Sequence, residues 1–180
     1  NVYVYEMNLP EQLNGDNPKS KKQFEIGRLQ AYLTATWEHV GRLHTHLKKI
    51  DVQDSEGNGI ELYASSTDSS VDAIGLTIQR TGTDTIYSEG GLRVYANQAH
   101  ISLNLSEVLI DNIESLQGIN LYATSTGSID FSADEVTIQN VGSDGIYMVG
   151  SGASADLSEV VIDTVAGDGI IADGGALVLD

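Results

Sequence analysis

One short motif recurs along this chain at intervals of about thirty residues. Its first clear copy is Leu76-Thr77-Ile78-Gln79, and the motif occurs at residues 76–79, 108–111, 136–139 and 160–163, with a fainter copy at 50–53. A polar step and a second isoleucine follow each clear copy, at Ile86, Ile119, Ile146 and Ile170, and the faint copy closes on Ile60. Repeats of this size are the signature of a solenoid, in which each unit contacts only its neighbours.

The spacing between copies indicates which kind of solenoid this is. The isoleucines at the third position of the motif are 32, 28 and 24 residues apart, at Ile78, Ile110, Ile138 and Ile162. Packed pairs of helices tolerate such changes in length poorly, whereas short strands joined by loops tolerate them well. The spacing therefore favours coils of strands.

Alternation within each unit supports strands with one buried side. Within residues 129–134, Ile, Phe and Ala alternate with Asp, Ser and Asp, which is the period-two pattern of a half-buried strand. Three such strands per unit predict an all-β, right-handed parallel β-helix whose rungs stack at about 4.8 Å. Gly59, Gly145 and Gly169 each precede a returning strand, and we expect them to supply the positive φ that tight corners need.

The regularity of the repeats divides the chain into two parts. Residues 50–180 form the regular β-helix repeats, and residues 1–49 form irregular N-terminal coils with an exposed polar loop near 8–24. Residues 24–50 also suit a helix on propensity, but alternation at Leu43, Thr45 and Leu47 favours strands. The run at 177–179 begins a new rung without a polar cap, so we expect a fragment of a longer stack.

Charge and composition exclude several classes of function. The net charge is −17, all nine Lys and Arg lie at or before Arg93, and residues 94–180 carry thirteen acidic and no basic side chains. We therefore expect no nucleic-acid partner, because that half cannot neutralise phosphates. The absence of cysteine excludes disulfides and thiolate metal sites. We predict no cofactor, with Ca²⁺ as the one ion that the acidic half could bind.

Candidate catalytic and metal-binding groups do not form a convincing set in the sequence. A polysaccharide-cleaving β-helix needs paired carboxylates with a basic group or a metal, and the last coils have no basic residue. Asn112 and Asn140 occupy equivalent steps, which predicts a structural asparagine ladder buried in a turn. His44 and His46 share one face of a strand, but the sequence places no third ligand beside them. We therefore predict no catalytic residue and no metal site.

The outward neighbours of the returning isoleucines form the best candidate for a binding surface. Alignment of these strands, with Ile86 matched to Ile146, predicts two outward columns. The first column includes Ile171 and the second includes Val149, beside the residues that we predict to bind a ligand. The predicted ligand-binding residues are Glu61, Tyr87, Asn120 and Tyr147 in the first column, and Tyr63, Glu89, Tyr122 and Asp173 in the second. Exposed tyrosines among carboxylates and amides suit sugar stacking or protein contact. The alternative is that the rings only stiffen the sheet.

The style of the repeats resembles a known family. The run Gly145-Ile146-Tyr147-Met148-Val149-Gly150 continues through 151–158 into Val160-Val161-Ile162, and Gly169-Ile170-Ile171 begins it again. Over residues 50–180 this is similar to the pertactin-like passenger domains of autotransporter adhesins from Gram-negative bacteria. The resemblance implies a β-helix anchored at the outer membrane or secreted, with no catalytic residues to carry over.

These observations predict a non-catalytic adhesin that binds a host matrix protein or glycan along one face, with self-association between β-helices as a further partner. Two alternatives remain open. One is an enzyme, namely a polysaccharide lyase, a hydrolase or a tailspike-type β-helix, which would gather carboxylates in a groove. The other is a spacer that holds another domain away from the cell.

Overall fold

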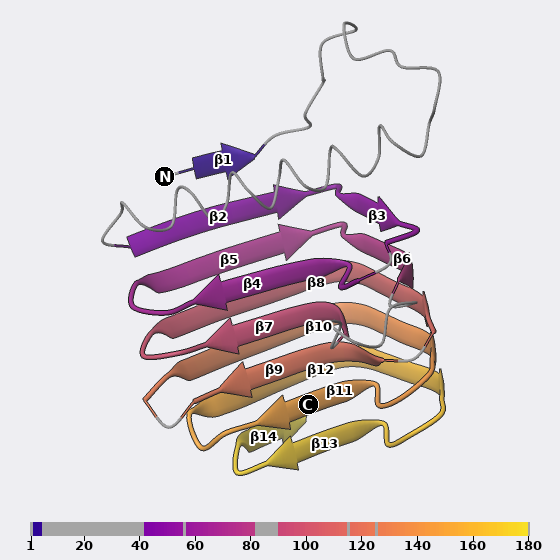
Figure 1. Cartoon of the computed structure of the whole chain (residues 1–180). Helices are drawn as coiled ribbons and strands as arrows, with labels where there is room; N and C mark the ends of the chain where they lie inside the picture. The colour runs from indigo at the N-terminus through magenta and orange to yellow at the C-terminus, as the bar shows by residue number, and fades with distance from the viewer. Residues whose placement is uncertain are drawn as a thin grey trace, which may run out of the picture.

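The chain folds into a solenoid of parallel strands, shown by a computed structural model (Figure 1). The structure describes residues 2–4, 42–55, 57–81, 90–114, 116–124 and 126–179. Its strands are β1 (Val2–Val4), β2 (Arg42–Lys48), β3 (Asp51–Gln53), β4 (Ile60–Ala64), β5 (Asp68–Ile74), β6 (Thr77–Thr81), β7 (Gly90–Ala96), β8 (His100–Ile113), β9 (Gln117–Ala123), β10 (Ser128–Val141), β11 (Ile146–Val149), β12 (Ala153–Val165), β13 (Ile170–Asp173) and β14 (Ala176–Leu179).

Two parallel sheets enclose the core. The nine-stranded sheet runs in the order β1-β2-β5-β8-β10-β12-β14, with β3 and β6 paired beside it, and the five-stranded sheet runs β13-β11-β9-β7-β4. In Figure 1 the chain passes from one sheet to the other and back as it descends from β2 to β14. The prediction of an all-β parallel solenoid is confirmed, and the described residues contain no helix. None of them, accordingly, forms a helix long and apolar enough to cross a membrane.

The repeated motif forms one continuous ladder inside the solenoid. The register pairs Val52 with Ile78, Ile78 with Ile110, Ile110 with Ile138, and Ile138 with Ile162. The middle three isoleucines of this ladder are fully buried. The alignment of the first motif is therefore confirmed. β-Branched side chains suit such a wall because each stacks on its equivalent in the next turn.

A column of glycines runs beside this ladder at Gly59, Gly91, Gly118, Gly145 and Gly169, and the first four pack against its isoleucines. A Cβ atom at Gly118 would lie 2.5 Å from Cγ2 of Ile138 and 2.7 Å from the carbonyl oxygen of Gly145. Among the described glycines, positive φ occurs only at Gly75, Gly150 and Gly174. The expectation that Gly59, Gly145 and Gly169 supply positive φ is therefore wrong. Gly59 and Gly145 are needed because the ladder leaves no room for a side chain there, whereas nothing lies within 4 Å of a Cβ atom at Gly169.

The sharp corners use residues with side chains instead. One column of positive φ contains Glu107, Glu135 and Glu159, and a second contains Asn112, Asn140 and Thr164, all with φ between 50° and 58°. Each column bends the long strands β8, β10 and β12 at the same step of the turn. Left-handed backbone is costly for residues other than glycine, although asparagine adopts it more readily than most.

The predicted asparagine ladder is only partly correct. Asn112 and Asn140 do occupy the same corner of successive turns, but both side chains are exposed rather than buried. The Asn140 amide donates a hydrogen bond of 2.8 Å to Asp111 in the turn before it. The role is structural as expected, because the left-handed corner selects for asparagine, yet no buried asparagine stack forms.

The regular stack includes a strand before the predicted boundary at residue 50. β2 pairs in register with β5, so that Thr45 faces Val71 and Leu47 faces Ala73, and β1 pairs with β2. Thr45 and Leu47 are buried, which confirms the strand predicted at 43–47. The predicted polar loop at 8–24 lies outside the described residues.

Candidate ligand-binding face

Three tyrosines stack on the outer side of the five-stranded sheet. Tyr63, Tyr95 and Tyr122 are paired in the register of β4, β7 and β9. Their ring centroids are 5.2 and 5.3 Å apart, and the planes of neighbouring rings differ by 7° and 1°. Inward-pointing, buried residues alternate with these rings along each strand. The stack thus follows directly from parallel strands in register.

The stacking decides which parts of the rings a ligand can reach. Tyr63 is 47% exposed and Tyr122 is 39% exposed, whereas Tyr95 between them is half-buried. Both faces of the Tyr95 ring are covered by its neighbours, so this ring offers solvent only its edge and hydroxyl. The outer face of Tyr122 also has a neighbour, because Val149 follows it in the same column. The stack therefore presents a row of hydroxyls and ring edges more than a row of flat faces.

An ion pair runs beside the tyrosine stack in the neighbouring column. Arg93 donates a hydrogen bond of 2.6 Å to Glu61, and both side chains are partly buried. The guanidinium carbon of Arg93 also lies 5.7 Å from the centroid of the Tyr95 ring, within cation–π range. We use the name tyrosine face for the surface formed by Glu61, Tyr63, Arg93, Tyr95 and Tyr122.

The register corrects the alignment that placed Tyr87 and Glu89 in these columns. β7 joins the sheet through Leu92, which pairs with Ile60 on one side and Ile119 on the other. The two column positions therefore belong to Arg93 and Tyr95, and the match of Ile86 with Ile146 is wrong. Tyr87 and Glu89 lie outside the described residues, so their role stays a prediction.

The other predicted residues differ in how accessible they are. Asn120 pairs with Arg93 and Tyr147 in the first column, but only 6% of it is exposed, so no ligand reaches it without movement of its surroundings. Tyr147 is half-buried in the next turn. Asp173 is exposed and follows Val149 in the second column, so the aromatic stack ends at Tyr122.

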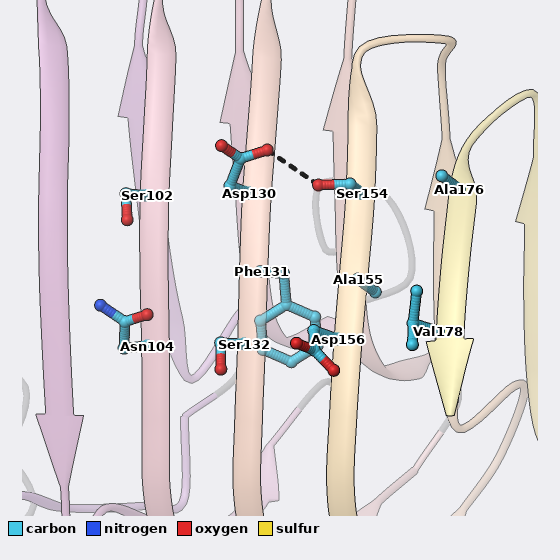
Figure 2. A pocket seen from close by; sticks show the side chains of 10 residues that line it. All are labelled: Ser102, Asn104, Asp130, Phe131, Ser132, Ser154, Ala155, Asp156, Ala176 and Val178. Carbon is cyan, nitrogen blue, oxygen red and sulfur yellow. Dashed lines mark hydrogen bonds between the residues drawn. The ribbon is translucent and has the colours of Figure 1, made fainter. Parts of the chain in front are cut away.

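A hollow of about 250 Å³ lies on the outer side of the other sheet (Figure 2). Its outward lining consists of short side chains of β8, β10, β12 and β14, and it contains no basic residue. We use the name serine–aspartate face for this surface, formed by Ser102, Asn104, Asp130, Ser132, Ser154, Asp156, Ala176 and Val178. These short side chains do not fill the space between the strands as the stacked tyrosine rings do, so the surface is hollowed.

Carboxylates on the serine–aspartate face do not stack on one another. Asp130 lies between Ser102 and Ser154 in the register, and Asp156 lies beside Ser132. Ser154 donates a hydrogen bond of 2.8 Å to Asp130, drawn in Figure 2. Interleaving of serine with aspartate spares the face the repulsion that stacked carboxylates would cause. It also places the two acids in different columns.

Fold and surface together define a parallel β-solenoid with one aromatic and one polar outer face. No family model matches this chain, and no curated protein and no solved structure is significantly similar to it. The likeness to pertactin-like passenger domains therefore rests on the repeats alone.

Proposed function

We propose that this chain is a non-catalytic adhesin, displayed on the outer membrane of a Gram-negative bacterium or secreted by it. The tyrosine face would bind a host matrix protein or glycan. The observation that carries the proposal is the continuous stack of Tyr63, Tyr95 and Tyr122, which remains partly open to solvent. Tyrosine suits binding surfaces because it offers a large rigid contact area and a hydroxyl with few rotatable bonds.

Within this proposal the geometry favours a protein partner over a glycan. A sugar that stacks on an aromatic ring needs an open ring face, and the middle ring has none. The hydroxyls of tyrosine rings whose centroids are 5.2 and 5.3 Å apart, beside the Glu61–Arg93 pair, suit the backbone and side-chain polar groups of a protein.

Binding of the purified chain to immobilised fibronectin, laminin, collagen and a glycan array tests the proposal. We expect saturable binding to at least one matrix protein. A glycan as the only ligand would keep the adhesin and reject the protein preference. Absence of binding to every probe would contradict the proposal and favour the spacer.

A carbohydrate-active enzyme is the second candidate, and the hollow on the serine–aspartate face is the observation that favours it. Asp130 and Asp156 are the acids that such an enzyme would use there. Incubation with a panel of acidic and neutral polysaccharides, followed by chromatography of the products, tests this candidate. Cleavage that is lost in both Asp130→Asn and Asp156→Asn would support the enzyme and contradict the adhesin.

A further inference from the structure

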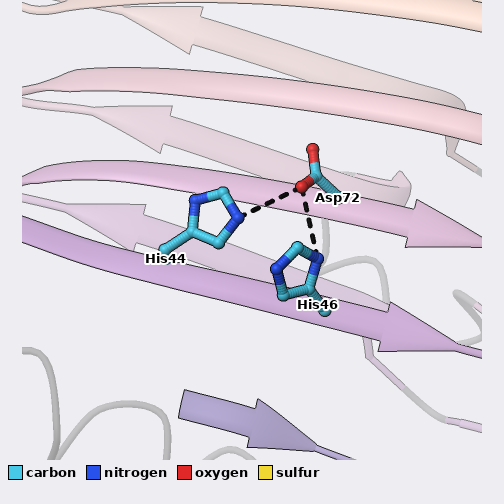
Figure 3. Close-up of side chains that lie close together, drawn as sticks. All are labelled: His44, His46 and Asp72. Carbon is cyan, nitrogen blue, oxygen red and sulfur yellow. Dashed lines mark ion pairs between the residues drawn. The ribbon is translucent and has the colours of Figure 1, made fainter. Parts of the chain in front are cut away.

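Two histidines and an aspartate meet on the outer side of the nine-stranded sheet, in the turns next to the serine–aspartate face and in the same two outward columns (Figure 3). His44 and His46 lie on β2, and Asp72 lies opposite His46 on β5. His44 Nε2 lies 3.2 Å and His46 Nδ1 lies 3.3 Å from the same oxygen, Oδ2 of Asp72. Residues i and i+2 of a strand share a face, and the parallel register brings the third group from the next turn.

The distances within this cluster match those of ligands around one metal ion. Zinc bonds to imidazole nitrogen and carboxylate oxygen are about 2.0–2.2 Å long, so two ligands of a tetrahedron lie about 3.3 Å apart. Both distances from Asp72 to the imidazoles have this value. The three donor atoms all lie within 4.8 Å of one another. Small rotations of the two rings would bring the two imidazole nitrogens to the same separation.

A fourth residue holds the carboxylate in the orientation that this arrangement needs. Asn104, in the following turn, donates a hydrogen bond of 2.7 Å to Oδ1 of Asp72. This bond occupies one carboxylate oxygen and leaves the other, Oδ2, directed at the two imidazoles. Such outer contacts are typical of metal sites, where they fix the direction of the ligand.

The donor types select the class of metal. Two imidazole nitrogens and one carboxylate suit Zn²⁺ and its neighbours in the first transition row, whereas Ca²⁺ and Mg²⁺ prefer all-oxygen sites. The side chains of His44, His46 and Asp72 are 38%, 40% and 29% exposed, so an ion can enter from solvent. Three protein ligands leave a position for water or for a group of a partner.

We propose that His44, His46 and Asp72 bind one divalent transition-metal ion of the Zn²⁺ class, which links strand β2 to strand β5. The ion would join two turns of the solenoid whose ligands are 26 and 28 residues apart along the chain. It therefore stabilises the pairing of these turns as well as offering an open coordination position at the surface. The inference is independent of the proposed function.

Titration of chelator-treated, tag-free protein with ZnCl₂ by calorimetry tests the site, with CaCl₂ and MgCl₂ as comparison ions. We expect one Zn²⁺ per chain, a rise in the melting temperature with Zn²⁺, and no such binding of Ca²⁺ or Mg²⁺. His44→Ala and Asp72→Asn should each weaken Zn²⁺ binding at least about tenfold and remove the rise. Asn104→Ala should weaken it about tenfold by freeing the carboxylate.

His100 provides the matched control because it also pairs with a carboxylate on this sheet, Asp130, at 3.6 Å, but without a second histidine. His100→Ala should bind Zn²⁺ as the parent chain does. Circular dichroism of every variant checks that the fold is kept, which we expect because the substituted side chains are partly exposed. No heat with Zn²⁺, equal losses in His44→Ala and His100→Ala, or equally strong binding of Ca²⁺ would overturn the proposal.

Discussion

The tyrosine face and the serine–aspartate face are built on the same scaffold yet differ in almost every property. On both, parallel strands in register place each side chain beside its equivalents in the turns above and below. Large flat rings fill the space between strands and form a stack, whereas serines and aspartates leave a hollow. The comparison teaches that the residue type of a column, and not the backbone behind it, determines what a face of this solenoid can do.

The largest effect we expect comes from the shared core, which sets the scale for both faces. In Gly118→Ala the new Cβ would meet Ile138 and the carbonyl of Gly145 at 2.5 and 2.7 Å, so the turn must shift. We expect a loss of about 3 kcal/mol in the free energy of unfolding, measured by urea denaturation. Gly169→Ala is the matched control, because nothing lies within 4 Å of its Cβ position. Equal stability of the two variants would contradict the packing role of the glycine column.

A smaller effect separates the two faces directly. Tyr95→Ala removes both stacked contacts of the tyrosine face, each worth about 1 kcal/mol beyond burial, so we expect a loss of about 2 kcal/mol. Ser132→Ala on the serine–aspartate face should change stability by less than about 0.5 kcal/mol, because this exposed side chain has open surroundings. The same denaturation experiment measures both. Similar values for the two variants would show that the stack adds no stability of its own.

The smallest effect concerns the corner that ends the outward columns of the nine-stranded sheet. Glu135 has φ of 54° between the register pairs Asp134–Ser106 and Val136–Val108, in the same column as Glu107 and Glu159. Glu135→Gly relieves left-handed strain and the repulsion between like charges, while it raises the entropy of the unfolded chain. We expect a gain of about 0.5 kcal/mol. Glu135→Ala keeps the strain, and a larger gain in that variant would show that charge outweighs backbone strain.

The core was predictable from the sequence because its signal is local. Apolar residues at period two identified the strands, and the recurrence of Ile78, Ile110 and Ile138 fixed the first ladder. The glycines were found at the correct positions for the wrong reason. Their role depends on a contact with an isoleucine of another strand, and composition alone does not reveal that contact.

The outward surfaces were less predictable, because they depend on register between turns of unequal length. The isoleucine at position 86 suggested one alignment, but the sheet uses Leu92, and the run Gly91-Leu92-Arg93-Val94-Tyr95 matches residues 59–63 once leucine is allowed in place of isoleucine. For the same reason the sequence did not identify Asp72 as the neighbour of His46, which lies 26 residues before it in the chain. The burial of Asn120 has no signal in its own strand.

The most direct test of the account compares ligand binding by two matched triple variants. Tyr63→Ser/Tyr95→Ser/Tyr122→Ser removes the aromatic stack, and Ser102→Ala/Asp130→Ala/Asp156→Ala changes the hollow. Surface plasmon resonance is measured on the matrix protein or glycan that the parent chain binds, after circular dichroism confirms β structure in both variants. The account predicts that the tyrosine variant loses binding at least about a hundredfold and that the other variant binds as the parent does. Unchanged binding by the tyrosine variant would contradict the account.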